Sequence, residues 1–301
     1  MSNIQAESVG ARARRTQAGA EARGRLLTGL PVKERRLDLA GISTAVLEGG
    51  EGPPLVLLHG PGEHAPKWLR VIPELAKSNH VIAPDLPGHG TTEAPDEIDI
   101  DRVLAWVRDL IASTCAAPPV LVGQIIGGAI AARFAARGSE RLDRLVLSDA
   151  LGIAPFRPAP EFGAALMAFV QQPTEETHDR LWERCAFDLD RLRDSMGESW
   201  DNLRAYNLDR ARAPKLKGTQ QRLMELFGIP AIPPEELARI AVPTTLIWGR
   251  HDLATSLSVA EAASTRFGWP LHVIEDAADD PPIEQPDAFV RGLRAALARS
   301  Q

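Results

Sequence analysis

Asp252 and Asp279 are the two side chains of this sequence best placed for proton-transfer chemistry. Each lies in a loop that follows a short apolar run, at 244–248 and 271–274. The carboxyl ends of parallel strands meet at one edge of a sheet, so we expect the two carboxyl groups to lie close together. Two neighbouring carboxyl groups resist double ionisation, and the pair could serve as general acid and base. The alternative is that both are solvated or hydrogen-bonded loop residues.

The segment Gly123-Gln124-Ile125-Ile126-Gly127-Gly128 has the glycines of a sharp strand-to-helix turn that in many enzymes presents a nucleophile. Its central position holds Ile125, a hydrocarbon side chain that cannot attack a substrate. A register shift of one residue brings only Gln124 or Ile126 to the centre. We therefore expect the turn to be kept and covalent chemistry at Ile125 to be lost.

A second loop, His59-Gly60-Pro61-Gly62, has the composition of a loop that stabilises a negatively charged oxygen. The residue after Gly60 would supply a backbone N–H, but it is Pro61, which has none. Gly62 could replace it if the loop runs differently. The N–H of Ile126 remains as the other expected donor.

Four further polar residues are candidates for the lining of a pocket: Glu63, His64, Gln124 and Asp149. For Glu63 and His64 the alternative is an exposed loop. Asp149 could act as an alternative acid, or cap the segment that follows it. None of the seven histidines convincingly supplies the missing base.

The elements that would position these residues alternate between strands and helices. Apolar runs at 55–58, 81–83, 120–122 and 145–147 predict strands that are buried on both faces, and helical spacing follows several of them. Residues 155–235 lack such runs and predict a helical cap between two halves of a core, at 31–154 and 236–301. We expect an α/β fold with a mostly parallel sheet flanked by helices. The basic segment 1–30 predicts a flexible arm.

Composition narrows the classes of partner. The net charge of -6 argues against nucleic acid and anionic membranes, and no apolar run reaches the roughly 18 residues of a membrane span. Cys115 and Cys185 are expected to be buried thiols of a reducing compartment, which favours the cytoplasm. No metal-ligand cluster or phosphate-binding glycine loop appears, so we expect neither metal nor cofactor. A homodimer is left open.

The order of these motifs resembles the α/β-hydrolase superfamily, in particular its capped haloperoxidase, C–C hydrolase and esterase branches. The resemblance extends from residue 32 to 298. It adds the turn Asp85-Leu86-Pro87-Gly88-His89-Gly90 and the run Glu284-Gln285-Pro286 to the segments above. It implies that Ile125 and Asp279 stand where the superfamily has its catalytic serine and histidine, and that Asp252 is the remaining acid.

Three functions fit these observations. The first is an enzyme that uses Asp252 and Asp279 for lyase, isomerase, cyclase or hydratase chemistry on a small, largely apolar molecule. The second is a non-catalytic protein that binds such a ligand. The third is an esterase-like hydrolase, which rests on the resemblance alone. We favour the first because the pocket-forming glycines are retained.

Overall fold

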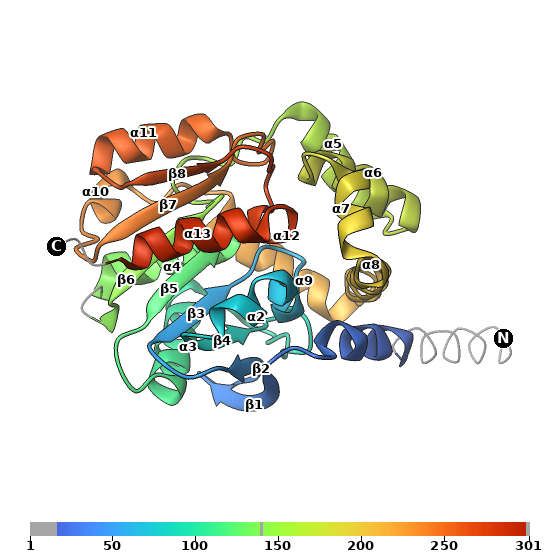
Figure 1. Cartoon of the computed structure of the whole chain (residues 1–301), viewed down its shortest axis with the longest axis horizontal. Helices are drawn as coiled ribbons and strands as arrows, with labels where there is room; N and C mark the ends of the chain where they lie inside the picture. Colours follow the sequence, from blue (N-terminus) through green and yellow to red (C-terminus); the bar gives the residue numbers. More distant parts are fainter. Residues whose placement is uncertain (1–16, 139–140, 299–301) are drawn as a thin grey trace, which may run out of the picture.

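The computed structural model describes residues 17–138 and 141–298, and its centre is an eight-stranded sheet. The strand order is β1-β2-β4-β3-β5-β6-β7-β8 (Figure 1). The β1–β2 and β2–β4 pairs are antiparallel, and the other pairs are parallel. The strands are β1 Lys33–Leu39, β2 Ile42–Gly49, β3 Pro54–Leu58, β4 His80–Pro84, β5 Val120–Gln124, β6 Arg144–Ser148, β7 Thr244–Gly249 and β8 Leu271–Ile274.

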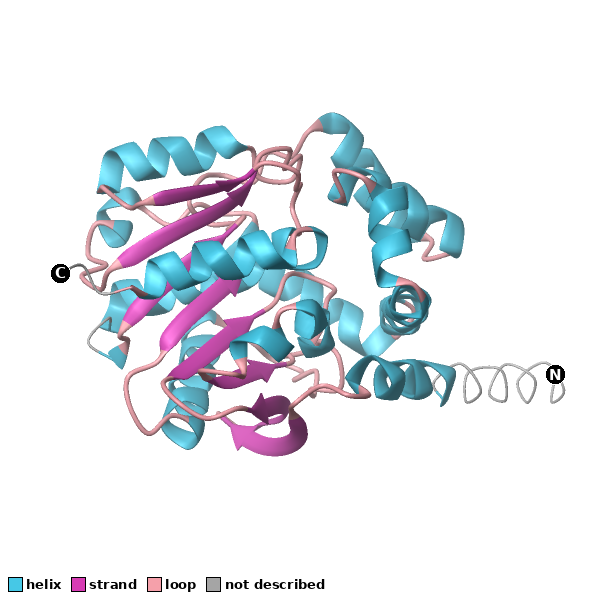
Figure 2. Ribbon diagram, viewed as in Figure 1, coloured by secondary structure: helices cyan, strands magenta, loops and turns pink. Residues whose placement is uncertain are grey.

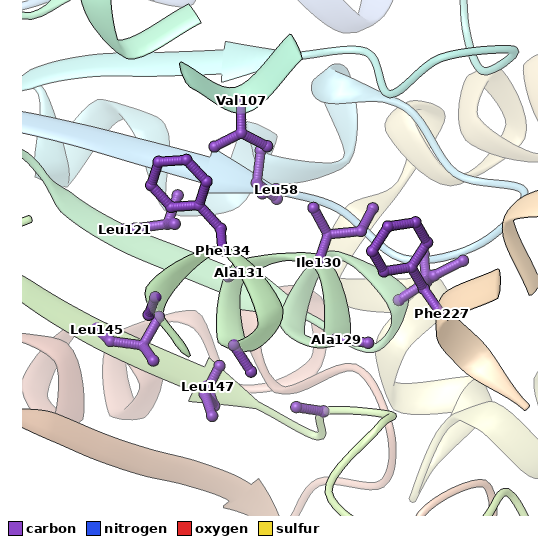
Figure 3. Packing of buried hydrophobic residues seen from close by; sticks show 14 of the residues in the cluster. Leu58, Val107, Leu121, Ala129, Ile130, Ala131, Phe134, Leu145, Leu147 and Phe227 are labelled. Atoms are coloured by element: carbon purple, nitrogen blue, oxygen red, sulfur yellow. The ribbon is translucent and has the colours of Figure 1, made fainter. Parts of the chain in front are cut away.

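Helices cover both faces of the sheet, which explains why β3, β5 and β7 are buried at every position (Figure 2). One face carries α3 (Ile100–Thr114), α4 (Ile126–Gly138) and α11 (Leu257–Phe267). The other face carries η1, α2 and α13, at Ala65–Arg70, Ile72–Leu75 and Pro286–Leu297. Figure 3 shows Phe134 of α4 beside Leu121 of β5, and Ile130 of the same helix beside Phe227. The expected fold class is confirmed.

A run of helices separates β6 from β7. It consists of α5 Pro160–Gln171, α6 Glu175–Cys185, α7 Leu189–Met196, α8 Glu198–Ala211, α9 Pro214–Leu223, the π-turn η3 Met224–Gly228 and α10 Pro234–Leu237. Helices α5 to α8 stand apart from the sheet layer and form the body of the cap (Figure 1). No helix in the described part of the chain has the length and apolar character needed to cross a membrane.

The expectation of a flexible arm over 1–30 is wrong for the described part of that segment. Residues 17–27 form a helix whose Ala22 and Leu26 are buried against Trp182 and Trp200 of the cap. The physical reason is that the helix is amphipathic. Ala22 and Leu26 form a short apolar stripe that packs in one cluster with cap residues, and the many arginines of the segment made this stripe easy to overlook in the sequence. Residues 1–16 lie outside the described residues.

Arg23 fastens this N-terminal helix (residues 17–27) to both halves of the molecule. Its guanidinium lies 3.0 Å from the fully buried Asp85 and 2.5 Å from Glu34 of β1. It also donates to the hydroxyl of Tyr206 in α8. Asp85 in turn accepts from the N–H groups of Ala65 and Thr91. The ion pair therefore joins the N-terminal helix, the core and the cap.

We expect Arg23→Met to lower the free energy of unfolding by about 3–5 kcal/mol, because it leaves the Asp85 carboxylate buried without its cation. Urea unfolding measures the loss. The control is Arg25→Met in the same helix, where an exposed side chain donates to Asn202; it should cost about 0–1 kcal/mol. Equal losses for the two variants would contradict a role for the buried ion pair.

Candidate active site

Ile125 occupies the sharp turn between β5 and α4 with a φ of 49°, a left-handed backbone that a β-branched residue rarely adopts. Neighbouring glycines impose the turn. A Cβ on Gly123 would lie 2.4 Å from the carbonyl oxygen of Gly127, and one on Gly127 would lie 2.4 Å from that of Leu58. These close backbone contacts favour the same turn for any side chain at position 125. Ile126 begins α4, so its N–H has no partner within the helix.

Asp252 lies in the loop after β7 and is 5% exposed. Its Oδ1 accepts from the N–H groups of Ala254 (2.7 Å) and Thr255 (2.8 Å). Its Oδ2 is buried and has no hydrogen-bond partner among the described residues. Burial raises the pKa of Asp252 to about 7, although its two backbone donors act to lower it.

Asp279 lies in the loop after β8 and is likewise 5% exposed. Burial is the main cause that raises the pKa of Asp279 above its ordinary value, and the charge of Asp252 is the next. The N–H of His251 donates to the carbonyl oxygen of Ala277 at 3.0 Å, so the loops that carry Asp252 and Asp279 lie side by side at the carboxyl edge of the sheet. Both are buried, which disfavours the alternative of solvated loop carboxylates. The other alternative, a hydrogen-bonded loop residue, agrees with the two backbone N–H groups that Asp252 Oδ1 accepts.

Asp149 is a third buried carboxyl group at this edge. It has a φ of 47°, its Oδ1 accepts from the N–H of Gly249 at 2.8 Å, and its Oδ2 accepts from the hydroxyl of Ser148 at 2.7 Å. Burial, followed by the charge of Asp252, raises the pKa of Asp149. The expectation that Asp149 caps the following segment is wrong, because α5 begins only at Pro160 and the carboxylate instead binds the end of β7.

In the loop after β3, the carboxylate of Glu63 binds a backbone N–H group of the same loop. Glu63 Oε2 accepts from the N–H of Gly60 at 2.6 Å, and Pro61 between them has no N–H to offer. Gly62 has a φ of 72° and is exposed. The side chain of Glu63 is 19% exposed, so an exposed loop position is wrong for this residue too. Burial raises the pKa of Glu63 to about 7.

Lys67 is the cation of the site, and its side chain is 2% exposed. Its ammonium donates to Glu63 Oε1 at 2.6 Å and to Gln124 Oε1, and pairs with Asp280 Oδ1 at 3.0 Å. Gln124 Nε2 then donates to Asp280 Oδ1 and to the carbonyl oxygen of Asp279, both at 3.1 Å. Gln124 is therefore a buried link between the turn at Ile125 and the loop of Asp279.

His64 is fully buried, so the expectation of an exposed loop residue is wrong for it. It turns toward the cap: its Nε2 lies 3.1 Å from Asn207 Oδ1, and its ring lies 4.4 Å from the ring of Tyr206. Asn207 Nδ2 also lies 3.4 Å from His178 Nε2. Burial lowers the pKa of His64 well below its usual range. His64 is thus a neutral contact between core and cap.

Three residues at the site were missed by the sequence reasoning: Lys67, Cys185 and Glu284. Glu284 Oε1 accepts from the N–H groups of Ala278 (2.8 Å) and Asp280 (3.3 Å), and its Oε2 accepts from Phe187 of the cap (2.6 Å). Cys185 is a half-buried free thiol, not the buried apolar residue expected; burial and then the charge of Asp279 raise its pKa. A lysine within the apolar stretch 65–69 was the one available signal.

A hollow of about 220 Å³ lies along the seam between cap and core, beside Glu284. It contains none of the four residues expected to line a pocket. Its lining residues are Arg70, Phe187, Asp188, Arg191, Leu192, Ser195, Asp276, Glu284, Gln285, Pro286 and Asp287. Across the described residues, no three histidine, cysteine or carboxylate side chains gather as a metal site would need.

The chain is similar to known proteins over most of its length. The model of the alpha/beta hydrolase family matches residues 55–292. The 2-hydroxymuconate semialdehyde hydrolase of Pseudomonas sp. (strain CF600) is 32% identical over 245 residues, which cover 75% of this chain and 81% of that protein.

Solved structures agree over most of the chain. The meta-cleavage product hydrolase of Pseudomonas fluorescens IP01 (CumD) is 28% identical, with a TM-score of 0.73 over 87% of this chain and 97% of its own. A membrane phospholipase A described as a bacterial virulence factor is 26% identical, with a TM-score of 0.79 over 98% of this chain and 96% of its own.

We expect Lys67→Met to lower the free energy of unfolding by about 3–5 kcal/mol, since it leaves Glu63 and Asp280 as buried carboxylates without their cation. Urea unfolding at neutral pH provides the measurement. Lys77→Met, which removes an exposed lysine paired with Glu74, should change stability by about 0–1 kcal/mol. If the two variants lose the same amount, Lys67 does not neutralise the site.

Asp252 predicts a pH dependence of stability. Its pKa is raised in the folded chain, so its destabilising effect appears as pH rises from the unfolded value near 4 through about 7. We expect Asp252→Asn to match the wild type near pH 4 and to be more stable near pH 8, by a few kcal/mol. Urea unfolding at the two pH values tests this, with Asp276→Asn in the exposed part of a nearby loop as control. A difference that shrinks with rising pH would refute it.

Proposed function

The chain belongs to the alpha/beta hydrolase family, and we propose that within it this protein is an enzyme that transfers protons through Asp252 and Asp279. Its substrate would be a small, largely apolar organic molecule that enters between core and cap. The observation that carries the proposal is the pair of buried carboxyl groups, of which Asp252 has one oxygen without a partner. Relatives of this chain carry names of hydrolases, which supports an enzyme of the superfamily.

The turn at Ile125 supports chemistry without a covalent intermediate. The strained backbone and the start of α4 are present, so the turn would present a nucleophile if one stood there. Isoleucine presents a hydrocarbon instead. It is 8% exposed, and its δ1 methyl group lies next to Gly60 in the loop after β3.

The two carboxyl groups have the protonation behaviour that acid–base catalysis requires. Because the pKa of Asp252 is about 7 and that of Asp279 is also raised, the pair holds a proton near neutrality and can release one. One member can accept a proton from the substrate while the other donates one. Elimination, hydration and isomerisation all proceed by these two steps, and activation of a water would give hydrolysis without an acyl-enzyme.

A second candidate is a ligand-binding protein without catalysis. It is favoured by the Glu63 carboxylate on the N–H of Gly60, next to a proline, because this loop then offers less stabilisation to a negatively charged oxygen. Esterase-like hydrolysis through a serine is the third possibility, and a chemical probe separates it from the other two.

We expect the wild-type chain to stay unlabelled by a fluorophosphonate probe, because Ile125 has no oxygen to react. The double variant Ile125→Ser/Asp279→His, with Asp252 kept, should gain stoichiometric labelling, since it would rebuild a serine–histidine–aspartate set on the existing turn. Intact-mass spectrometry reads both, and Ile125→Ser alone is the control. Stoichiometric labelling of the wild type would restore serine chemistry and overturn the proposal.

Turnover itself is tested by incubating the protein with a small-molecule extract and following by mass spectrometry which compounds change. We expect compounds that the wild type converts to be converted about 10²–10⁴-fold more slowly by Asp279→Asn, because a proton-transfer group is lost. Asp101→Asn, at an exposed residue of α3, is the matched control. If Asp279→Asn retains full turnover, the assignment of the pair fails; if nothing changes with the wild type, the ligand-binding candidate is favoured.

A further inference from the structure

The charges around Ile125 are strongly unequal. Asp149, Asp252 and Asp279 are all buried carboxyl groups. Their loops adjoin at the end of β7, because the N–H of Gly249 donates to Asp149 and the N–H of His251 donates to the carbonyl oxygen of Ala277, two residues before Asp279. Glu63 and Asp280 add two more carboxyl groups at the adjacent loops. Lys67 is the cation that faces them. Burial favours the neutral form of Asp149 and Asp279, and a bound cation would favour their ionised form, so the site is better suited to a cationic ligand than to an anionic one.

The lysine is not available to hold an anion. Lys67 has three N–H donors, and its three acceptors are Glu63, Gln124 and Asp280. His64 is neutral at physiological pH, because burial lowers its pKa, and its Nε2 is engaged by Asn207. Among the described residues that face this group of carboxylates, neither base offers an uncommitted positive charge.

Among the carboxyl groups at this edge, Asp252 has an oxygen that accepts no hydrogen bond from the described part of the chain. Asp252 Oδ2 is buried and lacks a donor, while Oδ1 of the same carboxylate has two. A buried carboxylate oxygen without a donor costs free energy, so a ligand that brings a donor to it is stabilised.

We propose that the site accepts a small, largely apolar amine, bound as the ammonium cation between Asp252 and Asp279 with its hydrocarbon part over Ile125. This inference rests on the proposed function for the place of the site, but not for the chemistry performed there. An ammonium supplies both the donor that Asp252 Oδ2 lacks and the positive charge that the carboxyl groups lack. An alcohol supplies only the donor, and a carboxylate supplies neither.

Three probes of one shape test the proposal: benzylamine, benzyl alcohol and benzoate. The readout is the NMR chemical shift of the Ile125 δ1 methyl group in methyl-labelled full-length protein, assigned with Ile125→Val. We expect saturable shifts with benzylamine at the lowest concentration, weaker binding of benzyl alcohol, and no shift with benzoate. Asp252→Asn should weaken benzylamine binding roughly ten- to hundredfold, as for the loss of a hydrogen bond to a charged group, and Asp101→Asn, at an exposed residue of α3, should leave it unchanged.

Benzoate or benzyl alcohol binding as tightly as benzylamine would overturn the inference, as would benzylamine binding that survives Asp252→Asn in a folded variant. Absence of benzylamine binding would overturn it too. If benzylamine fails while Asp279→Asn still abolishes turnover, only the ligand class is wrong. If benzylamine binds through Asp252 and no turnover is found, the ligand class stands and the proposed catalysis fails.

Discussion

The Lys67 ammonium is the interaction on which the arrangement of the site depends. Three loops that are far apart in sequence bring oxygen atoms to it: the loop of Glu63, the end of β5 at Gln124 and the loop of Asp280. Each oxygen is buried, and buried acceptors of this kind converge only where a donor with a matching charge stands between them. Through Gln124 and Asp280, the same ammonium fixes the backbone on both sides of the proposed reaction centre, at Ile125 and at Asp279.

The backbone of the turn at Ile125 does not depend on the side chain at this position. The left-handed backbone is enforced by the close approach of Gly123, Gly127 and the end of β3, and none of these contacts involves the side chain at 125. The fold of the superfamily is therefore compatible with a hydrocarbon at this position. What the site does must then come from the groups around the turn, which is consistent with chemistry varying on a constant fold.

The sequence predicted those features that depend on local pattern. Apolar runs such as Leu55–Leu58 identified buried strands, because a strand covered on both faces is apolar at every position. Asp252 and Asp279 could be placed through the resemblance to the superfamily, which assigns a position to each in the loops after the last two predicted strands. Lys67 could not, since its burial is decided by three acceptors from distant loops and not by its neighbours. The N-terminal helix was missed for the same reason: its stability comes from Trp182 and Trp200, more than 150 residues away.

The carboxyl group of Glu284 links the cap to the loop of Asp279 by hydrogen bonds to both. One of its oxygens holds the N–H groups of Ala278 and Asp280, while the other holds the N–H of Phe187 at the junction of α6 and α7. An outward movement of the cap at Phe187 would break its hydrogen bond to Glu284 Oε2. The other oxygen of that carboxyl group orders the loop of Asp279. Burial also raises the pKa of Glu284 to about 8. A displacement of Phe187 would therefore be transmitted through one carboxyl group to the backbone of Ala278 and Asp280, on both sides of Asp279.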